Sequence, residues 1–173
     1  PFALSILAEA HWATGDFRSA ERYYATAMQL APTVAGIGVR LAEARLDSGR
    51  PDKAVDELEE LIERFPTMME AHAQLARVYL KTGNKTKAIE SAKSLVDLFP
   101  DSARAHNVAS ALYLATGDRV KARRHLDQAA LIDPDLIQPT LNLARLARME
   151  GHLDTAEAQY RATLERFPNA IDA

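Results

Sequence analysis

A glycine recurs at every 34th residue of this chain, five times without a break. The glycines are Gly15, Gly49, Gly83, Gly117 and Gly151. An alanine follows each of them five positions later, at Ala20, Ala54, Ala88, Ala122 and Ala156, and a proline keeps the same step at Pro32, Pro66, Pro100, Pro134 and Pro168. Because the spacing is constant, the sequence predicts a stacked repeat array rather than an ordinary globular domain.

Each repeat is predicted to form two helices. Apolar residues follow helical spacing before the first glycine, at Leu4, Leu7 and Ala8, and again after it, at Ala20 and Tyr24. A glycine permits the left-handed backbone of a tight turn, and a proline cannot continue a helix because it lacks the amide hydrogen. The expected fold class is therefore all-α, built from antiparallel helix pairs.

The residue after each proline is predicted to cap the next helix. A side-chain oxygen is present at every one of these positions, where it can accept a hydrogen bond from a free amide of the first helical turn. The residues are Thr33, Thr67, Asp101, Asp135 and Asn169.

The repeats are expected to form one array over residues 1–173, because few glycines and prolines fall outside the 34-residue register. The predicted repeats are 1–34, 35–68, 69–102, 103–136 and 137–170, and residues 171–173 read as the start of a further helix. The chain reads as a piece of a longer array. Without a polar capping helix, the last repeat should expose Leu153, Leu164 and Phe167, which favours end-to-end packing between copies.

Composition narrows the classes of partner. The formal net charge is −3, so the chain lacks the strongly basic surface that a nucleic-acid-binding protein needs, and protein partners are favoured. There are no cysteines, which excludes disulfides and thiolate metal sites but suits the bacterial cytoplasm and the periplasm or envelope equally. No apolar run is long enough to span a membrane.

The repeated glycine, alanine, tyrosine and proline positions resemble the tetratricopeptide repeat (TPR) family across residues 1–170. The resemblance implies an α-solenoid of five helix pairs in a right-handed superhelix, with the first helix of each pair lining a concave groove for a peptide or partner protein. The sequence departs from the family at the first aromatic position, which suggests differently filled pockets there. That position holds Leu4, Gly38, His72, His106 and Thr140.

The resemblance also implies which side chains line the groove. The lining begins acidic and ends basic, and its predicted binding residues are Glu9, Trp12, Glu43, Arg77, Asn107, Asn142 and Arg145. The alternative is that these charges merely solvate a helical face. Trp12, the only tryptophan, either contacts a partner or packs under a preceding repeat.

The sequence gives little support for a nucleotide-binding, metal-binding or catalytic site. Gly36 and Gly38 lack the third glycine and the strand of a dinucleotide-binding loop, and close helix packing explains them better. His72 and His106 lie one repeat apart, too far to share a metal ion, and are expected to be packing residues. The family's terminal-carboxylate clamp is disfavoured because Glu9 and Glu43 would repel a carboxylate. We expect no catalytic residues, no metal and no cofactor.

A basic run from Arg119 to His125 lies on a predicted second helix, where a solvated face is the simplest interpretation and nucleic acid or an acidic partner is the alternative.

The sequence therefore predicts a non-enzymatic scaffold for protein–protein interaction. Its repeats look like those of bacterial TPR proteins in envelope, exopolysaccharide or protein-sorting assembly. The alternative is a substrate-recruiting TPR extension of a larger enzyme such as a glycosyltransferase.

Overall fold

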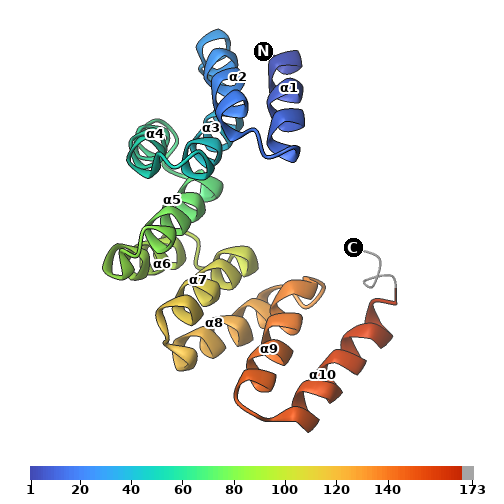
Figure 1. The fold of residues 1–173 in the computed structure, drawn as a ribbon. Helices are drawn as coiled ribbons and strands as arrows, with labels where there is room; N and C mark the ends of the chain where they lie inside the picture. The colour runs from blue at the N-terminus through green and yellow to red at the C-terminus, as the bar shows by residue number, and fades with distance from the viewer. Residues whose placement is uncertain (169–173) are drawn as a thin grey trace. The chain divides into compact units, whose positions relative to one another are not determined.

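The computed structural model describes residues 1–168, and all regular secondary structure within that range is helical (Figure 1). The helices are α1 (Phe2–Ala13), α2 (Phe17–Leu30), α3 (Ala35–Asp47), α4 (Pro51–Arg64), α5 (Met69–Lys81), α6 (Lys85–Leu98), α7 (Ala103–Thr116), α8 (Arg119–Ile132), α9 (Ile137–Met149) and α10 (Leu153–Arg166). The all-α prediction of two helices per repeat is confirmed.

The repeated glycines and prolines mark the helix boundaries as predicted. All five register glycines have positive φ, from +77° at Gly83 to +97° at Gly117. This backbone conformation is strained for any residue that has a Cβ atom. Every second helix ends two residues before its proline: α2 at Leu30 and α10 at Arg166, for example. The proline register thus stops each second helix, and the glycine register lets the chain reverse within each pair.

The predicted capping residues are wrong. The first helices begin one residue later, with Val34, Met68, Ser102 and Leu136 at the N-cap, and of these only Ser102 accepts a side-chain hydrogen bond, from the Ala105 amide. Asn169 lies outside the described residues.

Side-chain caps occur instead on second helices, directly after the glycine. Asp16, Asn84 and Asp118 each accept from the amide three residues on. These bonds lower the pKa of the Asp16 and Asp118 carboxyl groups.

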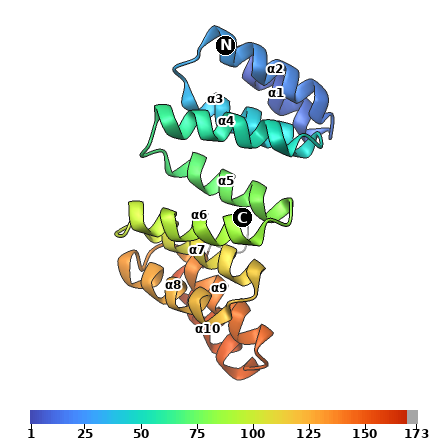
Figure 2. The same cartoon turned by 90° about the vertical axis from the view of Figure 1, so that its left-hand side faces the viewer.

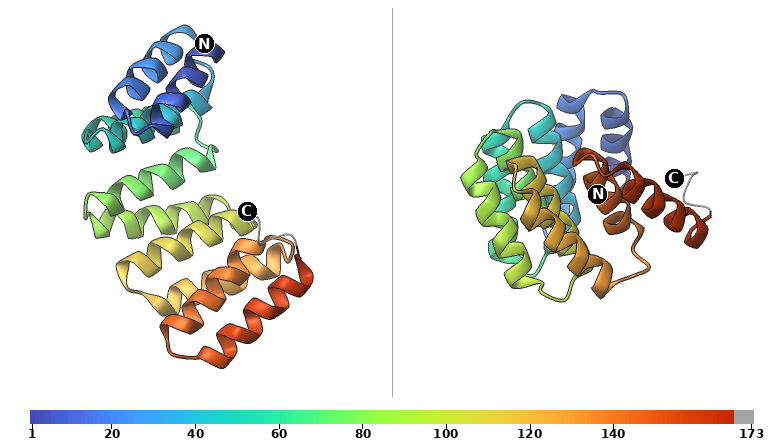
Figure 3. Two further views of the ribbon diagram at one scale, coloured as in Figure 1. Left: turned by 45° about the vertical axis from the view of Figure 1, so that its right-hand side comes forward. Right: turned by 90° about the horizontal axis from the view of Figure 1, so that it is seen from below.

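The chain divides into two compact units, Pro1–Ser91 and Ala92–Ala173. In the first unit α1 packs with α2 and α3 with α4, while α2 contacts α3 and α4 contacts α5 (Figure 2). In the second unit α7 packs with α8, α8 contacts α9, and α9 lies beside α10 at the red end of the chain (Figure 3). Each second helix in these contacts therefore packs against the first helix of the next repeat, as a stacked array requires.

Small residues let the helices approach. Ala8, Ala20 and Ala44 are fully buried around Tyr24 and Leu41 in the first unit. In the second unit Leu126 and Leu146 are fully buried and pack with Leu143. The cores are thus seams between neighbouring helices.

The first aromatic position is filled differently from repeat to repeat. At Gly38 the Leu61 side chain takes the space: a Cβ atom there would lie 2.8 Å from Leu61 Cδ1. Gly38 therefore serves close packing, as predicted, but Gly36 does not, since its Cβ position is open.

Histidine fills the same position in two other repeats. His72 Nε2 lies 2.8 Å from the Pro66 carbonyl oxygen, and His106 Nε2 lies 2.9 Å from that of Pro100. Each histidine thus ties the first helix to the loop before it, which makes both structural residues as expected.

Apolar side chains remain exposed on the last described helix. Leu153 is 64% exposed and Leu164 is 43% exposed, as predicted, whereas Phe167 is half-buried. The predicted start of a further helix at residues 171–173 lies outside the described residues. Within residues 1–168, none of the helices has the length and apolar character needed to cross a bilayer.

Candidate partner-binding surface

Arg40 links three of the predicted groove residues in the first unit. It lies on α3, where its Nε is 3.5 Å from Glu9 Oε1 on α1 and its Nη1 donates to Glu43 Oε2 at 3.0 Å. Its guanidinium also lies over the Trp12 ring, 5.6 Å from the centroid. Burial lowers the pKa of Arg40, but Glu43 and then Glu9 outweigh it and raise that pKa above its usual value.

Glu43 extends the connection to the next repeat. Its other carboxylate oxygen lies 3.6 Å from Arg77 Nη1 on α5, and its side chain is only 8% exposed. One turn further on, Lys81 Nζ donates to Asp47 Oδ1 at 2.6 Å. We call Glu9, Trp12, Arg40, Glu43, Asp47, Arg77 and Lys81 together the first-helix network.

Tyr24 on α2 packs against Trp12 of this network. Its ring meets Trp12 edge-on with centroids 6.4 Å apart, and its hydroxyl has no hydrogen-bond partner within residues 1–168. Burial raises the pKa of Tyr24, and the nearby Glu9 carboxylate adds to the effect although it lies outside hydrogen-bond geometry. Trp12 therefore packs against Tyr24 with the two rings perpendicular, and Arg40 lies over one face of its ring.

The second unit contains the other three predicted residues. Asn142 Nδ2 on α9 donates to Asn107 Oδ1 on α7 at 3.0 Å, so these two amides join neighbouring repeats. Arg145 is exposed and makes no ion pair with any described residue. Asn107 and Asn142 are thus brought together, whereas Arg145 stands apart.

Sequence reasoning missed Arg40 as a site residue. It belongs to the register position of Gln74 and Asn142, which is polar in three repeats but carries a charge only here. The sequence signal that could have identified Arg40 is its spacing from Glu43. The two residues are one helical turn apart, a spacing at which opposite charges meet.

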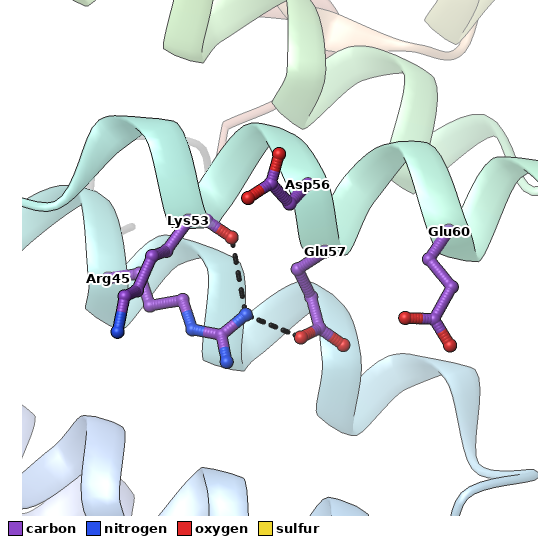
Figure 4. Close-up of a pocket in the computed structure, with 5 residues that line it drawn as sticks. All are labelled: Arg45, Lys53, Asp56, Glu57 and Glu60. Atoms are coloured by element: carbon purple, nitrogen blue, oxygen red, sulfur yellow. Dashed lines mark hydrogen bonds and ion pairs between the residues drawn. The ribbon is translucent and has the colours of Figure 1, made fainter.

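A second polar cluster lies where α3 meets the second helices α2 and α4. Arg45 Nη1 donates to Glu57 Oε2 at 2.5 Å and to the Lys53 carbonyl oxygen (Figure 4). Arg45 Nε also lies 3.8 Å from Glu21 Oε1. Glu21 also pairs with Arg50 at 3.0 Å. Burial raises the pKa of Glu57, and Arg45 opposes that rise. This cluster ties α2, α3 and α4 together.

An open cleft of about 350 Å³ lies beside that cluster, lined by Arg45, Lys53, Asp56, Glu57 and Glu60. Its lining is charged throughout and has no apolar floor of the kind that small-molecule sites use. It is better explained as the edge of a structural ion cluster than as a ligand site.

The basic run on α8 is not simply solvated. His125 Nδ1 lies 3.0 Å from His106 Nδ1, and its ring stacks on Tyr113. Arg123 pairs with Glu150 at 2.5 Å, and Lys121 pairs with Asp118 at 3.1 Å. Much of this run therefore stabilises helix packing in the second unit.

No cluster of three or more candidate metal ligands occurs within residues 1–168. Each unit thus carries its own polar surface on first helices: paired charges and one tryptophan in the first unit, and a pair of amides in the second. Such a surface can hold a polypeptide by hydrogen bonds and ion pairs, and the helix-pair architecture places the molecule among the α-helical repeat proteins.

Family models described as tetratricopeptide repeat match residues 11–67, 45–112, 103–128 and 137–162. The chain belongs to the tetratricopeptide repeat family. The repeat fold of this family is typically non-catalytic and supports protein–protein interaction in general.

Solved structures agree with this assignment. A thermophilic TPR protein from Thermus thermophilus is 25% identical, with a TM-score of 0.77 over 98% of this chain and 93% of the other. A tetratricopeptide repeat protein from Parabacteroides merdae is 19% identical, with a TM-score of 0.67 over 97% of this chain and 67% of the other. MamA from Desulfovibrio magneticus RS-1 is 18% identical, with a TM-score of 0.64 over 94% and 92%. No curated protein sequence matches this chain significantly.

Proposed function

We propose that this chain is an interaction scaffold that holds a peptide or partner protein against its first helices. The observation that carries the proposal is the first-helix network, in which Arg40 lies over the Trp12 ring of α1 and half-exposed Arg40, Arg77 and Lys81 pair with acids along α3 and α5. Arginine and tryptophan are enriched among residues that dominate binding energy at interfaces. In the second unit, Asn107, Asn142 and Arg145 are proposed to contact a partner in the same way.

Capture of a partner from a lysate of the source organism tests this proposal. Arg77→Gln removes one charge without placing a new carboxylate beside Glu43, so the fold should persist while partner binding weakens by about 1–3 kcal/mol. Lys85→Gln is the matched control, because Lys85 is exposed and its side chain makes no hydrogen bond or ion pair within the described residues. Equal capture by both variants would show that the first-helix network is not the working surface.

Among interaction scaffolds of this family, we propose a role in bacterial envelope, exopolysaccharide or protein-sorting assembly. The bacterial sources of the similar structures support a bacterial setting. The alternative, a TPR extension that recruits substrates to a larger enzyme such as a glycosyltransferase, would use the same surface. A catalytic domain encoded next to this segment would favour the enzyme, and a lipid-attachment signal would favour the envelope scaffold.

Self-association through the end helices is a separate proposal about partners. Leu7 on α1 is 47% exposed, whereas Leu41, at the same position of the next repeat, is 2% exposed under α2. Leu164 on α10 is exposed at the position where Met28 packs into the core. Sedimentation over a dilution series should show dimers that Leu7→Ser/Leu164→Ser abolishes, and a monomer at every concentration would reject self-association. We expect no nucleic-acid partner, given the net charge of −3.

A further inference from the structure

The first helix leaves exposed a set of apolar residues whose counterparts in the next repeat are buried. Leu7 is 47% exposed, and Ala10 is also exposed. Leu41 and Ala44, 34 residues later, are almost fully buried in the core that includes Tyr24 of α2. The exposed residues of α1 are therefore those that a second helix covers elsewhere in the first unit.

Helix α10 exposes the residues that provide such a cover. Tyr160 and Leu164 hold the register positions of Tyr24 and Met28, which pack into the same core as Leu41. Tyr24 is 1% exposed, whereas Tyr160 is half-buried and Leu164 is 43% exposed. The apolar residues of α10 thus match those of α1 as the two sides of one stacking contact.

The charges at these two ends are complementary. Glu43 and Arg77 hold the same register position in successive repeats, and they lie 3.6 Å apart. That position is Glu9 on α1 and Arg145 on α9. Glu9 is half exposed in its 3.5 Å contact with Arg40, and Arg145 is exposed. A second copy placed with the internal spacing would bring Arg145 of one chain against Glu9 of the other.

An apolar pair accompanies these charges. Asn107 and Asn142 form a 3.0 Å hydrogen bond between neighbouring repeats. The same register positions at the two ends hold Leu141, which is half-buried, and Ile6, which is 55% exposed. Two apolar side chains would therefore meet where two amides meet inside the second unit.

A hydrogen bond between successive repeats also has its counterpart at the ends. Ser48 Oγ donates to Glu21 Oε2 at 2.9 Å, and the same register positions hold Thr14 and Glu157. The hydroxyls of Thr14 and Ser48 each lie about 3 Å from the carbonyl oxygen three residues earlier, so they have the same orientation. Both bonds from Arg161 go to Glu157 Oε1, so Oε2 can accept from Thr14 of another copy.

One register position opposes the contact. Arg50 pairs with Glu21 at 3.0 Å, and Asp16 holds the position of Arg50 in the first repeat. Asp16 is about half exposed, so its repulsion of Glu157 is screened by water and salt, and Arg161 already balances Glu157. The contact therefore combines an ion pair and apolar burial with a single screened repulsion.

We propose that α9 and α10 of one copy stack against α1 of a second copy, in the register that successive repeats use within the chain. This inference rests on the self-association proposed above and specifies its contacts. The contact is heterologous, because two different surfaces meet, so each copy can engage one neighbour at each end. Leu7 and Leu164 supply apolar area, and the pairing of Arg145 with Glu9 fixes the register.

Charge reversal tests this register. In sedimentation of the full chain over a dilution series, Arg145→Glu and Glu9→Arg should each weaken self-association about tenfold, because like charges then meet. Arg145→Glu/Glu9→Arg in one chain should restore the association to within about threefold of the original. An equal mixture of the two single variants should also associate, since each reversed end then meets its complement.

Arg104→Glu and Glu70→Arg are the charge-matched controls. Arg104 on α7 and Glu70 on α5 are exposed, and neither forms an ion pair in the part of the chain that the structure describes. Each control should leave self-association within about twofold. Circular dichroism checks that every variant keeps its helices. Loss of folding cannot explain restoration in the double variant, because a change on α9 does not repair α1.

The outcomes are distinct. A double variant as weak as the single variants would overturn the head-to-tail register and assign any dimer to contact between like ends. A monomer at every concentration would overturn the proposal together with self-association. If that monomer still loses a captured partner through Arg77→Gln, the scaffold function stands and a different protein, rather than a second copy, is the occupant of these surfaces.

Discussion

Lys81 Nζ donates a 2.6 Å hydrogen bond to Asp47 Oδ1, and the two residues occupy the same position in successive repeats. Arg77 and Glu43 are related in the same way, 34 residues apart, with 3.6 Å between them. At each of these two register positions, neighbouring repeats thus carry side chains of opposite charge. Ion pairs of this kind select which repeat can stack beside which, although half-exposed pairs add little stability.

Two glycines of α3 should respond in opposite ways to alanine. Gly36→Ala adds a Cβ atom in open space within a helix, so we expect the free energy of unfolding to rise by about 0.5–1 kcal/mol. Gly38→Ala places that atom 2.8 Å from Leu61 Cδ1, and overpacking should outweigh the helix gain and lower stability by about 0.5–2 kcal/mol. Urea denaturation measures both. If the clash is the cause, Gly38→Ala should be stabilising when it is added to Leu61→Ala, although Leu61→Ala itself costs about 2–5 kcal/mol.

Arg45→Gln should destabilise the first unit. Its side chain is 20% exposed, and its loss leaves Glu57 partly buried without a cation, so we expect a cost of about 1–3 kcal/mol, below that of a fully buried pair. The exposed pair Arg161–Glu157 is the control, and Arg161→Gln should cost less than about 0.5 kcal/mol. Similar costs for the two variants would show that the α2–α3–α4 cluster is no stronger than a surface pair.

The stability of the second unit should fall at acid pH through His125. Burial, with the nearby His106, Arg124 and Lys121, holds the pKa of His125 below its usual value of 6.5. As pH falls, the unfolded chain therefore binds a proton at His125 more readily than the folded chain does. The contribution of His125 to the free energy of unfolding is complete above about pH 6.5 and is lost progressively as pH falls below that value. His106 and Tyr113 on α7 are the other groups that contact the ring.

Thermal unfolding between about pH 5 and 7 measures this dependence. His125→Gln should flatten the curve, whereas His152→Gln should not, because the His152 side chain is 65% exposed. An unchanged slope in His125→Gln would assign the acid sensitivity to other groups.

Asn84→Ala should weaken the start of α6. Asn84 Oδ1 accepts a hydrogen bond from the Lys87 amide at 3.1 Å, and loss of such a cap costs about 1 kcal/mol. Asn84→Ser keeps an acceptor and should retain most of the stability, as measured by chemical denaturation. A serine variant as unstable as the alanine variant would show that the asparagine acts through something other than its cap.

The helix pairs could be predicted from sequence because their boundaries depend on single residues. Glycine and proline act through their own backbone restrictions, so Gly117 or Pro32 marks a boundary whatever packs around it. The capping prediction failed because the helix after the proline begins one residue later than Thr33 or Thr67, and a shift of one position removes the oxygen from reach.

The site was less predictable because its contacts join different repeats. Glu9, Glu43 and Arg77 could be placed on first helices, but their connection through Arg40 depends on side-chain rotamers on two neighbouring helices. The Arg45 cluster likewise draws Glu21 from one repeat and Glu57 from another. No spacing within a single repeat encodes either arrangement.

The histidine bonds at the repeat joints also bear on how each unit responds to force. His72 holds the Pro66 carbonyl at one joint of the first unit, and His106 holds the Pro100 carbonyl at one joint of the second. The other joint of each unit has Gly38 or Thr140 at that position, and neither residue makes such a bond in the part of the chain that the structure describes. At those joints an arginine of the second helix takes over: Arg64 Nη2 donates to the Pro32 carbonyl at 2.6 Å, and Arg166 Nη2 donates to Asp135 Oδ1 at 2.7 Å. Each joint of a unit is therefore held by a side chain, from the first helix where histidine is present and from the second helix where it is not, so under a pulling load neither joint should open well before the other.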